Sequence, residues 1–125
     1  MMWPIHCVQG SKGAEFHEKC PNRGEKVISK GEDKDVEAYS GLEGPPGKEF
    51  DAELKKQGIT DVYCVGLAYD YCVGSTAVDA AKLGYKTFIV MDGTRAVNSA
   101  SAEAMKKRIS DAGVTEISLD QVPKA

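Results

Sequence analysis

The sequence lacks the hallmarks of several broad classes of protein. Basic residues are not in excess, since 16 Lys and Arg stand against 19 Asp and Glu, for a net charge of −3. This balance argues against binding to nucleic acid through a basic surface. No apolar run approaches the roughly 20 residues that cross a bilayer, and the first residues show neither the positive region nor the apolar core of a secretory signal. We expect a cytoplasmic protein that binds neither nucleic acid nor membranes.

Histidine is scarce, and the cysteines are few for a disulfide scaffold. The 125 residues, a length typical of one domain (1–125), include only 4 Cys and 2 His. The cysteines are too few and too unevenly spaced to predict a disulfide framework, so in a reducing compartment they are thiols. The four residues that come closest to a local metal site do not fit the usual spacing of a zinc finger. They are His6, Cys7, His17 and Cys20.

The second half of the chain alternates short apolar runs with helical windows, and each helical window ends at a glycine. Strands are predicted at 61–67, 86–91 and 114–119. One helix is predicted at 75–83, and a second is predicted to run to residue 112 from a cap at Asn98 or Ser99. Strands that alternate with helices at this spacing predict an α/β fold with a parallel sheet and crossover helices.

The first half is less regular. Residues 26–29 can form one more short strand, and residues 50–57 are predicted as a short helix. Between them, residues 31–48 are rich in Gly, Asp, Glu and Pro and are expected to form a long loop. Loops of this length are uncommon unless they have a function.

Cys72 lies where the predicted strand 61–67 ends and a helix begins. Backbone N–H groups in the first turn of a helix have no intrahelical partner, so they can stabilise a thiolate or receive the oxyanion of a tetrahedral intermediate. Ligands also collect outside the carboxyl ends of parallel strands. Position alone leaves Cys72 open to two interpretations, a nucleophile or a structural thiol that fills space. Cys64, in mid-strand, is interpreted as a packing residue.

Lys30 also follows an apolar run, and Gly31 comes next. A lysine at this position is commonly a solvated strand terminus. Beside a cysteine it can instead carry a proton or stabilise a thiolate. The residues alone leave both interpretations open.

The sequence closely resembles the nicotinamidase (pyrazinamidase) branch of the isochorismatase-like cysteine hydrolases. The resemblance covers nearly the whole chain, and its segments follow the family's order. They are Trp3-Pro-Ile-His-Cys-Val-Gln-Gly10, Gly13-Ala-Glu-Phe-His17, Lys30-Gly31 with Tyr39-Ser40-Gly41, Gly66-Leu-Ala-Tyr-Asp-Tyr-Cys-Val73 and Thr76-Ala-Val-Asp-Ala80. The first and fourth segments are the most specific. The implied fold is a three-layer, Rossmann-like parallel sheet flanked by helices.

The resemblance implies an activity, the hydrolysis of nicotinamide to nicotinate and ammonia in NAD salvage, through a thioester on Cys72. It assigns the catalytic lysine to Lys30. It also assigns an oxyanion hole to the backbone amides of Ala68 and Cys72, with a cis peptide bond between Leu67 and Ala68.

The same resemblance implies the binding residues. Trp3 and Tyr39 would line the pocket for the pyridine ring, with Tyr71 nearby. His6 would be one ligand of a divalent metal, usually zinc, that holds the pyridine nitrogen.

One departure from the family pattern is expected. The family places a catalytic aspartate and the other metal ligands on two strands upstream of the Trp-Pro-x-His motif, where this chain begins. We therefore expect a C-terminal portion of the domain, without the first two strands and with three of the four protein metal ligands missing. Zinc would then be held weakly, and the chain alone would show little or no turnover.

Three hypotheses for function follow from the resemblance. The first is a nicotinamidase-type amidohydrolase acting on nicotinamide or a similar pyridine carboxamide. The second is a non-catalytic truncated isoform that pairs with a full-length homologue, or with itself, through an exposed sheet edge. The third is a related hydrolase acting on another amide or on isochorismate. The set of Trp3, His6 and Tyr39 favours the pyridine amide.

Overall fold

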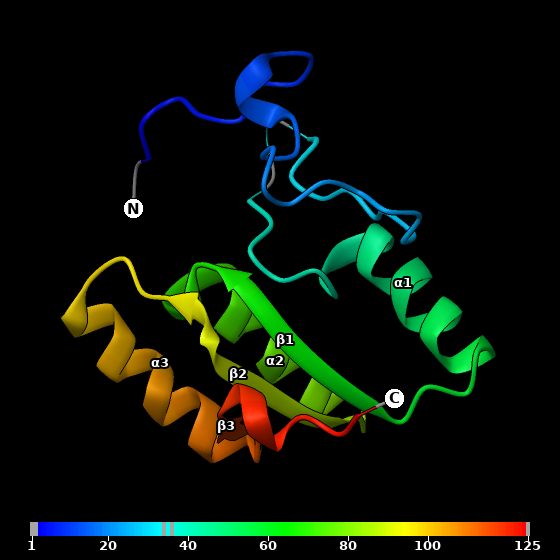
Figure 1. Cartoon of the computed structure of the whole chain (residues 1–125), viewed down its shortest axis with the longest axis vertical. Helices are drawn as coiled ribbons and strands as arrows, with labels where there is room; N and C mark the ends of the chain where they lie inside the picture. Colours follow the sequence, from blue (N-terminus) through cyan, green and yellow to red (C-terminus); the bar gives the residue numbers. More distant parts are fainter. Residues whose placement is uncertain (1–2, 34, 36, 125) are drawn as a thin grey trace.

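The fold is described by a computed structural model that covers residues 3–33, 35 and 37–124. Its helices and strands are α1 (Gly44–Lys56), β1 (Asp61–Leu67), α2 (Gly74–Lys82), β2 (Lys86–Arg95), α3 (Ser99–Ala112) and β3 (Thr115–Ile117). Three short helical turns complete the elements: η1 (Lys12–Ala14), η2 (Tyr69–Val73) and η3 (Leu119–Gln121). Figure 1 shows two parts, an α/β body built from residue 61 onward and a largely irregular N-terminal part above it.

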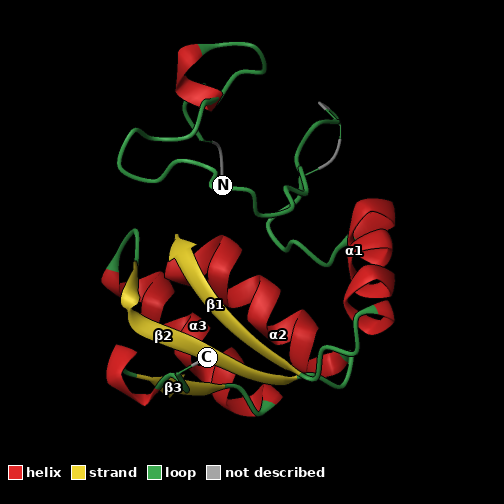
Figure 2. Cartoon of the chain, turned by 45° about the vertical axis from the view of Figure 1, so that its right-hand side comes forward, coloured by secondary structure: helices red, strands yellow, loops and turns green. Residues whose placement is uncertain are grey.

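The described strands form one parallel sheet in the order β1-β2-β3. Helices α2 and α3 lie together on one face of this sheet (Figure 2). The α/β fold with a parallel sheet and crossover helices is therefore confirmed. The carboxyl ends of the strands point toward the N-terminal part, so the turn after β1 lies at the end of the body that faces this part.

The predicted boundaries in the body agree closely with the structure. β1 spans the predicted residues, and α3 begins at Ser99 after Asn98, whose side chain accepts a hydrogen bond from Ser101 N at 2.9 Å as a helix cap. β2 continues four residues beyond the prediction, to Arg95. In contrast, β3 is shorter than predicted.

Two predictions for the N-terminal part are wrong. Helix α1 begins at Gly44 rather than residue 50, because Pro45 and Pro46 occupy first-turn positions whose N–H groups have no helical partner. The loop before it is correspondingly shorter. Residues 26–29 are not a strand: Val27 is 52% exposed, and the segment lies outside the described sheet, with Lys26 paired to Glu53 of α1 at 3.4 Å. A strand needs a hydrogen-bonded neighbour, and the described residues place none beside this segment.

The core lies between the sheet and the two helices. Ile89 of β2 and Ile109 of α3 are completely or almost completely buried, at 0% and 1% exposed. Gly74 allows α2 to begin close to α3, because a Cβ there would lie 2.4 Å from Met105 Sδ and 2.6 Å from the carbonyl oxygen of Tyr69. This close packing fixes the chain immediately after Cys72.

A smaller cluster connects the N-terminal part to the body. Leu42, from the loop before α1, is buried with Ala80 of α2 and with Tyr85, and Phe50 and Leu54 of α1 pack against them.

In the described part of the chain, no helix has the length and apolar character needed to span a bilayer.

Candidate active site

Cys72 lies in η2, a single turn of π-helix between β1 and α2. The sequence predicted a helical first turn here; the structure inserts this wider turn before α2 begins. The peptide bond between Leu67 and Ala68 is cis, as the resemblance implies. The carbonyl oxygen of Ala68 accepts hydrogen bonds from Tyr71 N at 3.1 Å and Val73 N at 3.0 Å, so the turn closes tightly around the half-buried cysteine.

Lys30 reaches Cys72 from the irregular N-terminal part. Its Nζ lies 3.4 Å from Cys72 Sγ, within hydrogen-bond distance for sulfur, and also donates to the carbonyl oxygen of Ala38 at 2.9 Å. The two residues are 42 positions apart in the sequence, and the fold brings a cation directly against a thiol. Such a pair can stabilise a thiolate and can supply or remove a proton.

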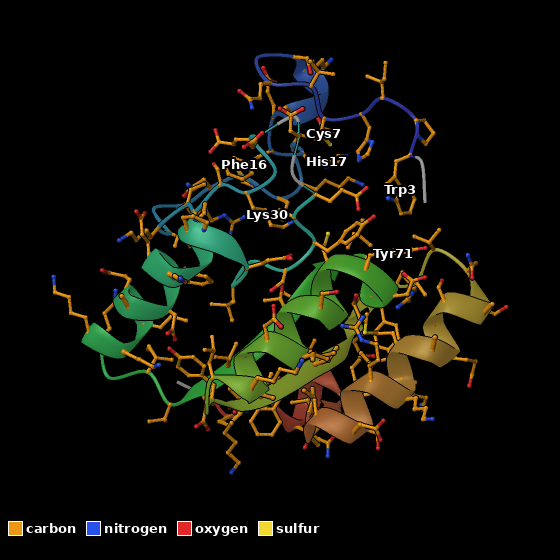
Figure 3. The ribbon with its side chains drawn as sticks, turned by 180° about the vertical axis from the view of Figure 1, so that it is seen from behind. Trp3, Cys7, Phe16, His17, Lys30 and Tyr71 are labelled. Carbon is orange, nitrogen blue, oxygen red and sulfur yellow. The ribbon has the colours of Figure 1, made fainter. Side chains whose placement is uncertain are left out.

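Three aromatic side chains form a cluster next to this pair. Trp3 Nε1 donates to Tyr39 Oη at 3.0 Å. The ring centre of Tyr71 lies 4.9 Å from that of Trp3, at 80°, and 5.5 Å from that of Tyr39, at 47°. Figure 3 shows Trp3 and Tyr71 close together near the start of α2. The cluster of Trp3, Tyr39 and Tyr71 offers ring edges and faces to a flat aromatic ligand.

The described residues do not complete a metal site around His6. Its Nδ1 lies 2.6 Å from the carbonyl oxygen of Pro4, to which it donates, and its ring centre is 6.5 Å from that of Trp3. Among the described residues there is no group of three or more His, Cys, Asp or Glu that could hold a metal ion. A tetrahedral zinc ion takes four ligands, so these residues alone do not fit it.

The other cysteines differ from Cys72 in their surroundings. Cys7 and Cys20 are exposed, whereas Cys64 is buried in β1. Burial raises the pKa of the Cys64 thiol to about 11, which keeps it protonated and supports its interpretation as a packing residue.

Asp70, a residue that the sequence analysis missed, anchors the cysteine turn to the start of α3. Its side chain is 5% exposed and accepts hydrogen bonds from Val97 N at 2.9 Å, from Asn98 N at 3.3 Å and from the Ser101 hydroxyl. Burial acts to raise the pKa of Asp70. The Ser101 hydroxyl and the two amides outweigh burial and lower the pKa below its ordinary value. In the sequence, the only sign of this role was an acidic residue two positions before the cysteine. Its hydrogen-bond partners lie 27 to 31 residues further along the chain, so local pattern does not reveal them.

The comparisons with known proteins show the family to which the chain belongs. The isochorismatase domain model matches residues 2–121. The chain belongs to the isochorismatase family. It is 40% identical over 113 residues to the nicotinamidase of Schizosaccharomyces pombe, covering 88% of this chain and 50% of that protein.

Solved structures of family members have the same fold. The protein PnC1 from L. infantum, in complex with nicotinate, superposes with a TM-score of 0.88 at 35% identity, and the match covers 95% of this chain and 62% of that one. The pyrazinamidase of Pyrococcus horikoshii, in complex with zinc, superposes with a TM-score of 0.83 at 34% identity, and the match covers 94% of this chain and 64% of that one. The chain spans about half the length of most of the curated relatives it matches.

The contacts of Asp70 predict a pH-dependent contribution to stability. We expect Asp70→Asn to lower the free energy of unfolding at pH 7 by about 1–3 kcal/mol. The NH₂ group of the new side chain would face donors from which the carboxylate accepts hydrogen bonds, so at least one of those donors would lose its partner. Folding lowers the pKa of Asp70. The carboxylate therefore stabilises the folded chain fully at a pH above the pKa of an aspartate in the unfolded chain, about 3.9. This stabilisation is lost as the pH falls through the lower pKa of the folded state. Urea unfolding between pH 3 and 8 measures the difference.

The difference between wild type and Asp70→Asn should therefore shrink below a pH of about 4. Asp111→Asn, the same change at an exposed position on α3, is the control and should stay close to wild type throughout. A difference for Asp70→Asn that is constant across the pH range would contradict the role of its carboxylate.

Proposed function

We propose that this chain supplies the nucleophile, the neighbouring cation and the ring-binding side chains of a nicotinamidase-type amidohydrolase. The observation that carries the proposal is the 3.4 Å contact between Lys30 Nζ and Cys72 Sγ beside the aromatic cluster. The relatives called nicotinamidases support it. A thiol nucleophile is kept reduced in the cytoplasm, where we place the reaction.

In the first half of the proposed reaction the amide is cleaved. The Cys72 thiolate, paired with the Lys30 ammonium, attacks the carboxamide carbon, and a C–S bond forms as the carbonyl oxygen takes the negative charge. The backbone amides of Ala68 and Cys72 are proposed to hold this oxyanion. The C–N bond then breaks, the departing nitrogen takes a proton from Lys30, and ammonia leaves a thioester behind.

In the second half water cleaves the thioester. Neutral Lys30 accepts one proton from the attacking water, the C–S bond breaks, and nicotinate leaves. The Cys72 thiolate and Lys30 ammonium are thereby restored, and the second proton of the water passes to solvent, where it protonates the ammonia released in the first half. One amide and one water give one carboxylate and one ammonium ion.

The aromatic cluster is proposed to bind the pyridine ring. A pyridine carboxamide is flat, and aromatic side chains bind flat rings by edge-to-face and offset contacts. One structural neighbour is in complex with nicotinate, the product of this reaction. If His6 binds zinc, as the resemblance implies, the remaining ligands come from outside the described residues.

Nicotinaldehyde tests the nucleophile without requiring turnover. The yeast nicotinamidase, a structural neighbour, has been solved with this aldehyde as an inhibitor. We expect Cys72 to add to the aldehyde carbon, forming a C–S bond while the oxygen gains a proton, to give a thiohemiacetal. With carbonyl-¹³C nicotinaldehyde, NMR should show the carbonyl signal replaced by that of a tetrahedral carbon.

The matched variants separate the two residues. Cys72→Ser should abolish the tetrahedral signal, and Lys30→Met should weaken the adduct because no cation then faces the sulfur. Cys7→Ser, at an exposed cysteine, should leave the adduct unchanged. A full signal from Cys72→Ser would show that another group is the nucleophile and would overturn the proposal.

The open edge of β1 favours a second candidate function, pairing with a full-length homologue. β1 is the edge strand of the described sheet, and its apolar residues Val65 and Leu67 are 59% and 75% exposed. Exposed edges of this kind accept further strands. Several structural neighbours are longer than this chain: about 40% of each has no counterpart here.

Co-expression with a full-length nicotinamidase tests the pairing. We expect a stable complex in size-exclusion chromatography that Val65→Asp disrupts, because a carboxylate cannot be buried in the new contact. Leu83→Asp, at an exposed leucine after α2, is the control. Separate elution of the two wild-type chains at micromolar concentration would contradict this second function.

A further inference from the structure

Thr76 joins the cysteine turn to the loop before α1. This residue lies in the first half of α2, four positions after Cys72. Its hydroxyl donates to the carbonyl oxygen of Cys72 at 2.7 Å and accepts from Gly41 N at 2.8 Å. A threonine hydroxyl can donate one hydrogen bond while it accepts another, so a single side chain makes both contacts.

The loop that Thr76 contacts holds the other site residues. Within residues 38–42, the carbonyl oxygen of Ala38 accepts from Lys30 Nζ at 2.9 Å, and Tyr39 Oη accepts from Trp3 Nε1 at 3.0 Å. Lys30 and Trp3 both come from the irregular N-terminal part, and Figure 3 shows both directed toward the start of α2. Their positions therefore depend on where the 38–42 loop lies.

Burial fixes one end of this loop. Ser40 is 2% exposed and its hydroxyl accepts from Leu42 N at 3.0 Å, while Leu42 packs with Ala80 and Tyr85. The backbone of Gly41 passes close to Thr76, since a Cβ on Gly41 would lie 3.7 Å from the Thr76 hydroxyl oxygen. The bond from Gly41 N to Thr76 thus ties the loop to the same turn of chain that carries Cys72.

We propose that Thr76 is a positioning residue that aligns Lys30 and Trp3 with Cys72. The inference rests on the proposed function, because it concerns the geometry of that same site. Thr76 does not itself touch the sulfur in this arrangement: it acts through the Cys72 carbonyl on one side and through the 38–42 loop on the other.

Substitution by valine tests the hydroxyl with little change in shape. We expect Thr76→Val, which removes both hydrogen bonds of the hydroxyl, to weaken the nicotinaldehyde adduct of Cys72 by about fivefold or more. Thr76→Ser retains the hydroxyl and should restore binding to near the wild-type level. Thr87→Val is the matched control, because Thr87 is 3% exposed and its hydroxyl donates to the Tyr85 carbonyl at 3.0 Å within the body.

The fluorescence of Trp3 distinguishes a positioning role of Thr76 from a purely stabilising one. It is the only tryptophan of the chain, so fluorescence reports its surroundings directly. In folded Thr76→Val the emission should shift to longer wavelength as Trp3 leaves Tyr39, while Thr76→Ser and Thr87→Val should match wild type. If Thr76→Val does not fold, Thr76→Ala against Thr76→Ser makes the same comparison.

The double variant Lys30→Met/Thr76→Val separates positioning from an independent effect. If Thr76 acts in part by placing Lys30, Thr76→Val should weaken the adduct by a smaller factor in the Lys30→Met background than in the wild-type chain, where both Lys30 and Trp3 are displaced. Wild-type affinity and emission for Thr76→Val, or the same losses for Thr87→Val, would overturn the inference. Absence of any adduct in the wild-type chain would instead overturn the proposed function.

Discussion

The contact between the Lys30 ammonium and the Cys72 sulfur is the interaction on which the proposed site depends. Lys30 is exposed and Cys72 is half-buried, so solvent screens the pair and its attraction is small. The pair therefore cannot hold the N-terminal part in place by itself. Its geometry has to come from the surrounding contacts, which fix the two partners from different parts of the chain.

Cys72 is fixed by the α/β body. The turn that carries it begins at the carboxyl end of β1, closes on the Ala68 carbonyl and continues into α2 at Gly74, which packs against α3. The buried Asp70 carboxylate connects the same turn to the backbone at the start of α3. The cysteine is thus held by the sheet and both helices, at the edge where parallel sheets commonly bind ligands.

Lys30 is fixed by a more extended set of contacts. It bonds to Ala38, whose loop is attached to α2 through the Thr76 hydroxyl and through buried Leu42. Few of these contacts involve regular secondary structure. The site therefore combines one partner on a well-packed framework with another held by side-chain and loop contacts.

The sequence predicted the body better than the N-terminal part, for physical reasons. β1, α2 and α3 follow from local periodicity and from glycines that end helices, such as Gly113 in the left-handed region after α3. In contrast, whether residues 26–29 form a strand depends on a neighbour, which local pattern does not reveal. Predicting the start of α1 required recognising Pro45 and Pro46 as first-turn residues.

The site shows the same division. Position alone left Cys72 open to two interpretations, a nucleophile or a structural thiol, and only the family resemblance singled out Lys30 as its partner. The structure then placed them 3.4 Å apart. Asp70 and Thr76 were missed because their roles depend on partners 27 to 35 residues away, at Val97 and at Gly41.

Cross-linking of the native chain measures this central contact most directly. A short reagent with an iodoacetyl group for thiols and a succinimidyl ester for amines, followed by peptide mass spectrometry, identifies the lysine nearest to Cys72. We predict that Cys72 links to Lys30 ahead of every other lysine. A dominant link from Cys72 to another lysine, such as Lys82 at the end of α2, would contradict it.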